Sequence, residues 1–277
     1  MKKYVNLLLA LVAMTGAAQA ASKSPFRIFD ATAYQQKPDM RGYGIEPIDI
    51  VYVSQLWPKW PSGVGIDSLP DSSTLKRLAS RLSSHNRPVV VDIEHWPVRG
   101  SPETVQNSIR KYRSVLGSLK QLAPSLKLGL YGVLPTVEYH RALEDTGSPK
   151  YNSWHAENKK LFAISKDVEY TFPSVYTFNL NQRNWEKYAI AQIREARMYG
   201  KPVYVFLWPQ YHESNPILGK RYLSYQYWIL QLETAFKFAD GIVIWGGHKN
   251  GGRETWNESA DWWLATKDFI NKLSNRH

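Results

Sequence analysis

The stretch Pro88-Val-Val-Val-Asp92-Ile-Glu94-His-Trp96-Pro97 joins an apolar run directly to two carboxylates. A short β-branched run between turn formers is typical of a strand buried on both faces, as in a parallel sheet. Because side chains alternate along a strand, Asp92 and Glu94 point the same way, with Cα atoms roughly 6.6 Å apart. Two partly buried acids that repel each other are expected to differ in pKa, so that one keeps its proton near neutral pH. The pattern suits acid catalysis; a capping aspartate beside a salt-bridged surface glutamate is the other interpretation.

Strand-like and helix-like segments alternate along the rest of the chain. Strands are expected at 26–30, 49–54, 89–94, 127–133, 172–178, 201–208 and 240–247. Helices are expected at about 75–84, 102–122, 185–199, 224–239 and 260–273, and residues 138–158 are expected to form an irregular loop before a helix. Such alternation implies βαβ units and a parallel sheet. The sequence therefore predicts an α/β fold, a TIM-type (β/α) barrel of seven parallel strands, or of the usual eight, in a single domain from 21 to 277.

Chemically versatile residues follow the ends of five of these strands. They are Trp57, Asp92, Glu94, Tyr176, Trp208, Tyr211 and Trp245. The carboxyl ends of barrel strands meet at one face, which is where such folds place their active sites. This convergence favours the catalytic interpretation of Asp92 and Glu94.

The first 20 residues have the pattern of a secretory signal. Two lysines precede an apolar run from Val5 to Met14, and an Ala-Gln-Ala site ends at Ala20. Such a run is too short to span a bilayer and is typical of a segment removed after export. We therefore expect a signal peptide at 1–20, a mature protein without a transmembrane segment, and a periplasmic or extracellular location.

Composition narrows the chemistry. The chain has no cysteine, which excludes disulfides, a thiol nucleophile and a cysteine metal site. Its formal charge is +11, or +9 once Lys2 and Lys3 leave with the signal, and such an excess favours an anionic partner or serves solubility. The 11 tryptophans and 17 tyrosines suit sugar binding as well as core packing.

Several of these strand ends together resemble the animal and venom hyaluronidase family, whose barrel is a distorted one of seven strands. The resemblance lies in Ile50-Val-Tyr-Val-Ser-Gln-Leu56, Leu69-Pro-Asp-Ser-Ser-Thr-Leu75, Asp92-Ile-Glu94-His-Trp96, Gly129-Leu-Tyr-Gly132, Pro173-Ser-Val-Tyr176, the run from Pro202 to Tyr211, and Gly241-Ile-Val-Ile-Trp245-Gly246. The motifs occur in the family's order over roughly residues 26 to 250. The chain thus resembles a divergent, cysteine-free relative.

The resemblance implies substrate-assisted glycoside hydrolysis. Glu94 would protonate the glycosidic oxygen, and Asp92 would orient and stabilise the substrate's acetamido group as that group attacks the anomeric carbon. The implied substrate-binding residues are Tyr52, Trp96, Tyr131, Tyr176, Trp208, Tyr211 and Trp245. Since Asp92 and Glu94 lie two residues apart, replacing Asp92 by asparagine is expected to lower the pKa of Glu94.

The motif also departs from the family. His95 stands where the family usually has a second acid, and Pro97 where it has an arginine. The substrate is therefore predicted only as a polysaccharide that contains N-acetylhexosamine, either hyaluronan-like or from a bacterial envelope or capsule.

Two other functions fit the same residues. A non-catalytic barrel would bind polymer with its aromatics, and a polysaccharide lyase would use Tyr176 or Tyr211 as its base. The seven histidines show no metal-ligand spacing, and the glycines at 246–247 and 251–252 form no nucleotide fingerprint but a flexible loop. No metal and no cofactor are predicted. Nucleic acid is not predicted as a partner, because lysine and arginine are dispersed along the chain.

Overall fold

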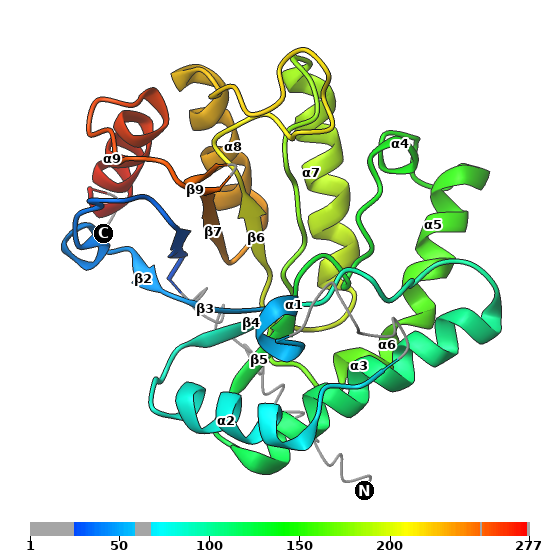
Figure 1. Ribbon diagram of the computed structural model, residues 1–277. Helices are drawn as coiled ribbons and strands as arrows, with labels where there is room; N and C mark the ends of the chain where they lie inside the picture. Colours follow the sequence, from blue (N-terminus) through cyan, green and yellow to red (C-terminus); the bar gives the residue numbers. More distant parts are fainter. Residues whose placement is uncertain (1–24, 59–67, 250, 276–277) are drawn as a thin grey trace, which may run out of the picture.

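A computed structural model describes residues 25–58, 68–249 and 251–275 (Figure 1). Its strands are β1 (Arg27–Thr32), β2 (Glu46–Pro47), β3 (Asp49–Tyr52), β4 (Pro88–Asp92), β5 (Lys127–Leu130), β6 (Tyr204–Leu207), β7 (Gly241–Gly246), β8 (His248–Lys249) and β9 (Gly252–Arg253). The signal peptide predicted at 1–20 lies outside the described residues. No described helix is both long and apolar enough to cross a membrane.

The parallel strands form a ring. One sheet has the order β2-β1-β7-β6 and another the order β3-β4-β5. Residues 171–177 join them, through parallel bridges from Tyr131 to Phe172 and from Ser174 to Phe206. On the other side β2 and β3 are separated by one residue, so the run 46–52 pairs with β1 and then with β4. Counting the runs 46–52 and 171–177 as one strand each, the described residues contain seven parallel strands, which confirms the predicted distorted barrel.

The observed strands differ from the expected ones at their ends. The strand expected at 89–94 ends at Asp92, so Glu94 lies just beyond β4. The fifth, at 172–178, makes only isolated bridges, because Pro173 has no N–H to donate to a ladder. The second ends at Tyr52, where the short helix α1 (Val53–Leu56) begins. Gly246 and Gly247 precede the antiparallel hairpin β8–β9, and Gly252 belongs to β9, where a flexible loop was expected.

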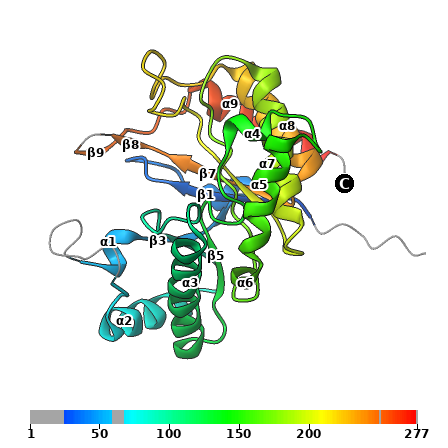
Figure 2. The same ribbon diagram turned by 90° about the vertical axis from the view of Figure 1, so that its right-hand side faces the viewer.

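Helices surround the ring. They are η1 (Met40–Tyr43), α1, α2 (Ser72–Ser83), α3 (Pro102–Leu122), α4 (Tyr139–Ala142), α5 (Pro149–Lys160), α6 (Phe162–Ser165), α7 (Gln182–Arg197), α8 (Tyr225–Phe238) and α9 (Asp261–Ser274). In Figure 1, α2 and α3 lie below the strands, and α7, α8 and α9 lie above them; Figure 2 shows the side view.

Local signals explain where the helices begin. Asp71 caps α2, which begins three residues before the expected start at 75; Ser101 caps α3, which begins at Pro102 as expected. The prediction of an irregular loop at 138–158 is wrong, since α4 and much of α5 lie there. Ser148 and Pro149 repeat the Ser101-Pro102 signal, but the polar composition of α5 hides it.

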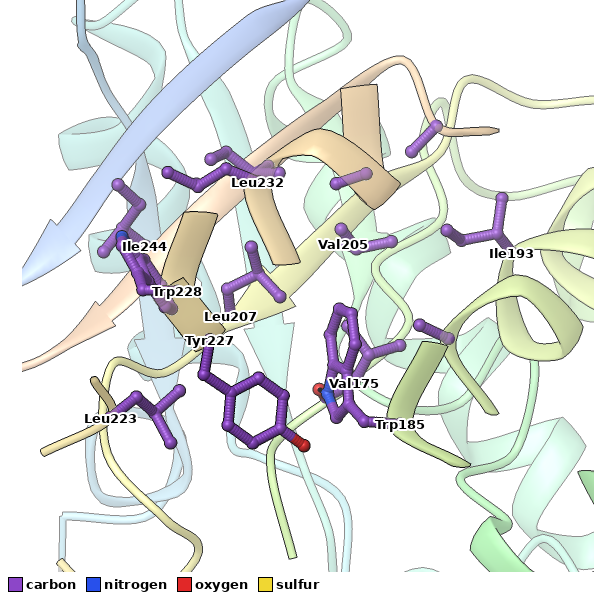
Figure 3. Close-up of a cluster of buried hydrophobic side chains, with 14 of the residues drawn as sticks. Val175, Trp185, Ile193, Val205, Leu207, Leu223, Tyr227, Trp228, Leu232 and Ile244 are labelled. Atoms are coloured by element: carbon purple, nitrogen blue, oxygen red, sulfur yellow. Dashed lines mark hydrogen bonds between the residues drawn. The ribbon is translucent and has the colours of Figure 1, made fainter. Parts of the chain in front are cut away.

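Alternation along the strands divides the core into an interior and an outer layer. The side chains that point into the ring pack together. They come from alternate residues of each strand and include Phe29, Val90, Phe206 and Val243. On the outside, the next residues along the strands pack against helices. Figure 3 shows one such layer, in which Val205 and Leu207 of β6 lie near Trp185 of α7 and Trp228 of α8.

Candidate active site

Asp92 and Glu94 face the inside of the barrel where β4 ends. Val90 precedes them with the same parity and belongs to the interior cluster, whereas Val91 and Ile93 pack outward. Both acids line a cavity of about 330 Å³ at the carboxyl ends of the strands. The predicted orientation of the pair is therefore confirmed.

A second cavity of about 250 Å³ adjoins the first. Glu94, Tyr131, Tyr176 and His212 line both cavities, whereas Asp92 lines only the larger one. Glu94 thus stands where the two cavities meet. A ligand that occupies both cavities would place the bond between its two parts beside this carboxyl group.

Burial and charge separate the two acids. Burial, followed by the charge of Glu94, raises the pKa of Asp92 to about 7. Burial also raises the pKa of Glu94, although this side chain is exposed to solvent at the cavity surface. Asp92 Oδ1 is buried and has no hydrogen-bond partner among the described residues, which favours the neutral acid. Of the two acids, Asp92 therefore has the stronger tendency to keep its proton near neutral pH.

This difference bears on one expectation for the pair. The charge of Glu94 adds to burial in raising the pKa of Asp92, whereas burial accounts for the raised pKa of Glu94. No charge of Asp92 contributes to the raised pKa of Glu94, so the fall in the Glu94 pKa expected for Asp92→Asn stays a prediction.

Four predicted aromatic residues form one wall of the larger cavity. Tyr176 stacks on Trp245 with ring centroids 5.9 Å apart, and both rings meet Trp208 edge-on, at 5.6 Å and 5.0 Å. Tyr52, also predicted to bind substrate, lines neither cavity, but its hydroxyl accepts a hydrogen bond of 3.2 Å from the indole of Trp245. Tyr131 lines both cavities and donates to Ser174 Oγ at 3.1 Å.

Two other predicted binding residues have different surroundings. Tyr211 lies outside both cavities and packs on Tyr227 of α8, because it is an odd number of residues from Trp208 and so faces outward. Trp96 borders the smaller cavity but is only 2% exposed, and it packs edge-on against Trp57 and Tyr112. Trp96 therefore anchors the acidic loop in the core and is no open platform for a sugar.

Sequence reasoning missed several polar residues of the larger cavity, namely His212, Glu213, Lys220, His248 and Lys249. His212 could have been found from the sequence, because it is an even number of residues from Phe206 and Trp208 and so is expected to face the same way. The others lie on the 212–222 loop and on β8, whose positions depend on tertiary contacts. His248 stacks on Trp245, with centroids 4.9 Å apart. Among the described residues no three His, Asp or Glu side chains gather as metal ligands.

Comparison with known proteins gives similarity in structure only. No family model matches the chain, and no curated protein matches it by sequence. Bee venom hyaluronidase superposes with a TM-score of 0.62 and 16% identity, over 90% of this chain and 97% of that one. Its complex with a hyaluronic acid tetramer gives 0.61 and 16%, over 90% and 96%. An endo-β-1,4-mannanase from Thermotoga petrophila gives 0.51 and 12%, over 91% and 78%. At such identities the likeness shows a shared barrel fold.

Proposed function

We propose that the protein is an exported glycoside hydrolase that cleaves a polysaccharide containing N-acetylhexosamine. The observation that carries the proposal is the placement of the two acids: Glu94 stands at the meeting point of two cavities, and Asp92 lies beside it in the larger one. The similarity of the fold to bee venom hyaluronidase supports the substrate class. The signal-like first 20 residues support export, which fractionation of expressing cells would test.

The geometry suits substrate-assisted hydrolysis. The aromatic wall holds the N-acetylhexosamine unit in the larger cavity beside Asp92, and the leaving sugar occupies the smaller one. The acetamido oxygen attacks the anomeric carbon while Glu94 gives its proton to the leaving oxygen, which yields a cationic cyclic intermediate. Water then attacks that carbon as its bond to the acetamido oxygen breaks, and Glu94 takes a proton from the water. The configuration at the carbon is retained.

Binding would favour the protonated form of Glu94, the residue that must give a proton. A sugar that fills the cavities displaces water from Glu94 and so raises its pKa further. The positive charge that develops on the acetamido group next to Asp92 favours the carboxylate form of Asp92. Both effects leave Glu94 as the acid and Asp92 as the stabilising anion when the bond breaks.

The lyase alternative is disfavoured by the two tyrosines that it would need. Burial raises the pKa of Tyr176 well above its ordinary value, so deprotonation of this residue is costly. Tyr211 lies outside both cavities. A non-catalytic barrel remains the alternative that the experiment must separate.

The decisive experiment incubates the mature protein with hyaluronan, chitin oligosaccharides and bacterial envelope glycans, and analyses the products by mass. We expect saturated products with new reducing ends. Glu94→Gln keeps the shape but removes the acid, so turnover should fall about 10²- to 10⁴-fold while polymer binding persists. Glu103→Gln, an exposed acid in the first turn of α3, is the control and should remain active.

Unsaturated products would identify a lyase, and binding without products would identify a binding barrel. Near-wild-type turnover of Glu94→Gln on a genuine substrate would refute the mechanism.

A further inference from the structure

His212 occupies a position that the proposed mechanism does not use. Its backbone N–H donates to Thr177 O at 2.7 Å, which fixes the end of the β6 loop against the run 171–177. Its half-buried side chain lines both cavities together with Glu94 and Tyr176. Among the described residues, only Glu94, Tyr131, Tyr176 and His212 line both cavities.

Local contacts determine which ring nitrogen of His212 carries the proton. The backbone N–H of Ser214 donates to His212 Nδ1 at 3.1 Å, and Ser214 Oγ lies 2.8 Å from the same nitrogen. A nitrogen that accepts from an N–H cannot itself carry a hydrogen there, so the neutral ring has its proton on Nε2. Nε2 makes no hydrogen bond within the described part of the chain, which leaves an N–H donor without a protein acceptor.

The ring is held firmly and is kept neutral. Its centroid is 5.0 Å from that of Phe178, 6.2 Å from Trp208 and 6.3 Å from Tyr176. Burial lowers the pKa of His212, against the opposing charge of Glu213. A rigid, uncharged donor loses little conformational entropy when it forms a hydrogen bond to a ligand.

We propose that His212 is a substrate-binding residue, whose Nε2–H donates a hydrogen bond to an oxygen of the sugar at the meeting point of the two cavities. The proposal rests on the proposed glycoside hydrolase function. It assigns His212 to substrate recognition beside Glu94, and it gives the residue no part in proton transfer.

Two substitutions test the roles of the two ring nitrogens of His212 one at a time. His212→Asn places an amide oxygen near the position of Nδ1, so it keeps the acceptor for Ser214 but removes the Nε2 donor. His212→Gln places an amide NH₂ near the position of Nε2, so it keeps the donor but removes the acceptor. If His212 binds substrate, Asn should raise KM roughly 3- to 10-fold, the worth of one neutral hydrogen bond, and Gln should be the milder change. If the ring only holds the loop, the order reverses, and the proposal is overturned.

A measurement without turnover distinguishes this proposal from the proposed function. The imidazole ¹⁵N signals of the wild-type protein are recorded while N-acetylglucosamine, and then its β-linked oligomers, are added. We expect the protonated Nε2 signal of His212 to shift at saturation. A shift without any hydrolysis supports the role of His212 and refutes the hydrolase. Hydrolysis without a shift, or a proton on Nδ1, refutes the role of His212 alone. If the protein neither binds nor hydrolyses these sugars, both proposals are refuted.

Discussion

Asp92 is a residue whose ionisation opposes folding. Its pKa rises from 3.8 to about 7 on folding. A raised carboxyl pKa gives stability that is fully present below pH 4 and is lost as the pH rises to 7. At 1.36 kcal/mol per pKa unit, this loss amounts to about 4 kcal/mol at most. The active site is thus expected to destabilise the protein under the conditions where it works.

Asp92→Asn should remove that loss. We compare the free energy of unfolding of the variant with that of wild type at each pH. The difference should favour the variant more at pH 8 than at pH 4, by up to about 4 kcal/mol, because asparagine does not ionise. Urea unfolding at both pH values measures the difference. Glu94→Gln removes both the repulsion on Asp92 and the cost of ionising the partly buried Glu94, and should show a gain of the same sign. An equal effect of Asp92→Asn at both pH values would contradict the raised pKa.

At the scale of elements, the close contact between β5 and the run 171–177 depends on Gly129. A Cβ built on Gly129 would lie 2.4 Å from the ring of Phe172 and 2.7 Å from the carbonyl oxygen of Tyr170. Gly129→Ala should therefore overpack this contact and lower the free energy of unfolding by about 1–3 kcal/mol.

The matched control is Gly117→Ala in the middle of α3, where nothing lies within 4 Å of the added carbon. There alanine should stabilise the helix by about 0.5–1 kcal/mol. Urea unfolding compares the two variants. Equal effects would show that the barrel does not close tightly at Gly129.

A single buried glutamine connects three loops of the larger cavity. Gln210, 2% exposed, accepts from Trp208 Nε1 at 2.7 Å. Its amide donates to Lys220 O at 2.9 Å and to Glu254 Oε1 at 3.2 Å. Trp208 and Lys220 line the cavity, and Glu254 follows the β8–β9 hairpin, which carries His248. Gln210 is therefore expected to position the aromatic wall and the loop beside it.

Gln210→Met should raise KM several-fold with a much smaller effect on kcat, because the acids on β4 are untouched while the wall loosens. The control is Gln231→Met. Gln231 is equally buried, but its amide donates to Thr177 Oγ1 at 2.7 Å, away from the cavity. Gln210→Met removes three side-chain hydrogen bonds and Gln231→Met removes one, so both should lower stability, by about 1–3 kcal/mol for each buried partner left unpaired. If KM rises equally in both variants, Gln210 contributes to stability but does not position the aromatic wall.

At the scale of the whole molecule, the net charge of +11 bears on the charge of the polymer. Lys220 and Lys249 line the larger cavity, although Lys220 also pairs with Glu213 at 3.1 Å. If the substrate is anionic, raising the salt from about 0.1 M to about 1 M shortens the Debye length from about 10 Å to about 3 Å and should raise KM. The value of kcat should change much less. A neutral chitin oligosaccharide is the control. If KM is independent of salt for every polymer that is cleaved, the positive charge does not attract substrate and serves solubility only.

The sequence by itself determined the features that depend on near neighbours along the chain. Alternation after Val90 placed Asp92 and Glu94 on one face, and the local pattern predicted α3 from 102 and α2 to within three residues of its start. Parity would also have excluded Tyr211 and selected His212, had it been followed beyond Trp208. These features rest on backbone geometry and local hydrogen bonds, which a few residues specify.

Only the tertiary structure decided the features that depend on distant segments. Ring closure requires the run 46–52 to pair on both sides, and the fifth strand is completed by bridges rather than by its own ladder. Which acid keeps the proton is set by how deeply each carboxyl group is buried, and the walls that bury Asp92 come from other strands. Burial and pairing are properties of the assembled neighbours, so the local pattern of the sequence does not contain them.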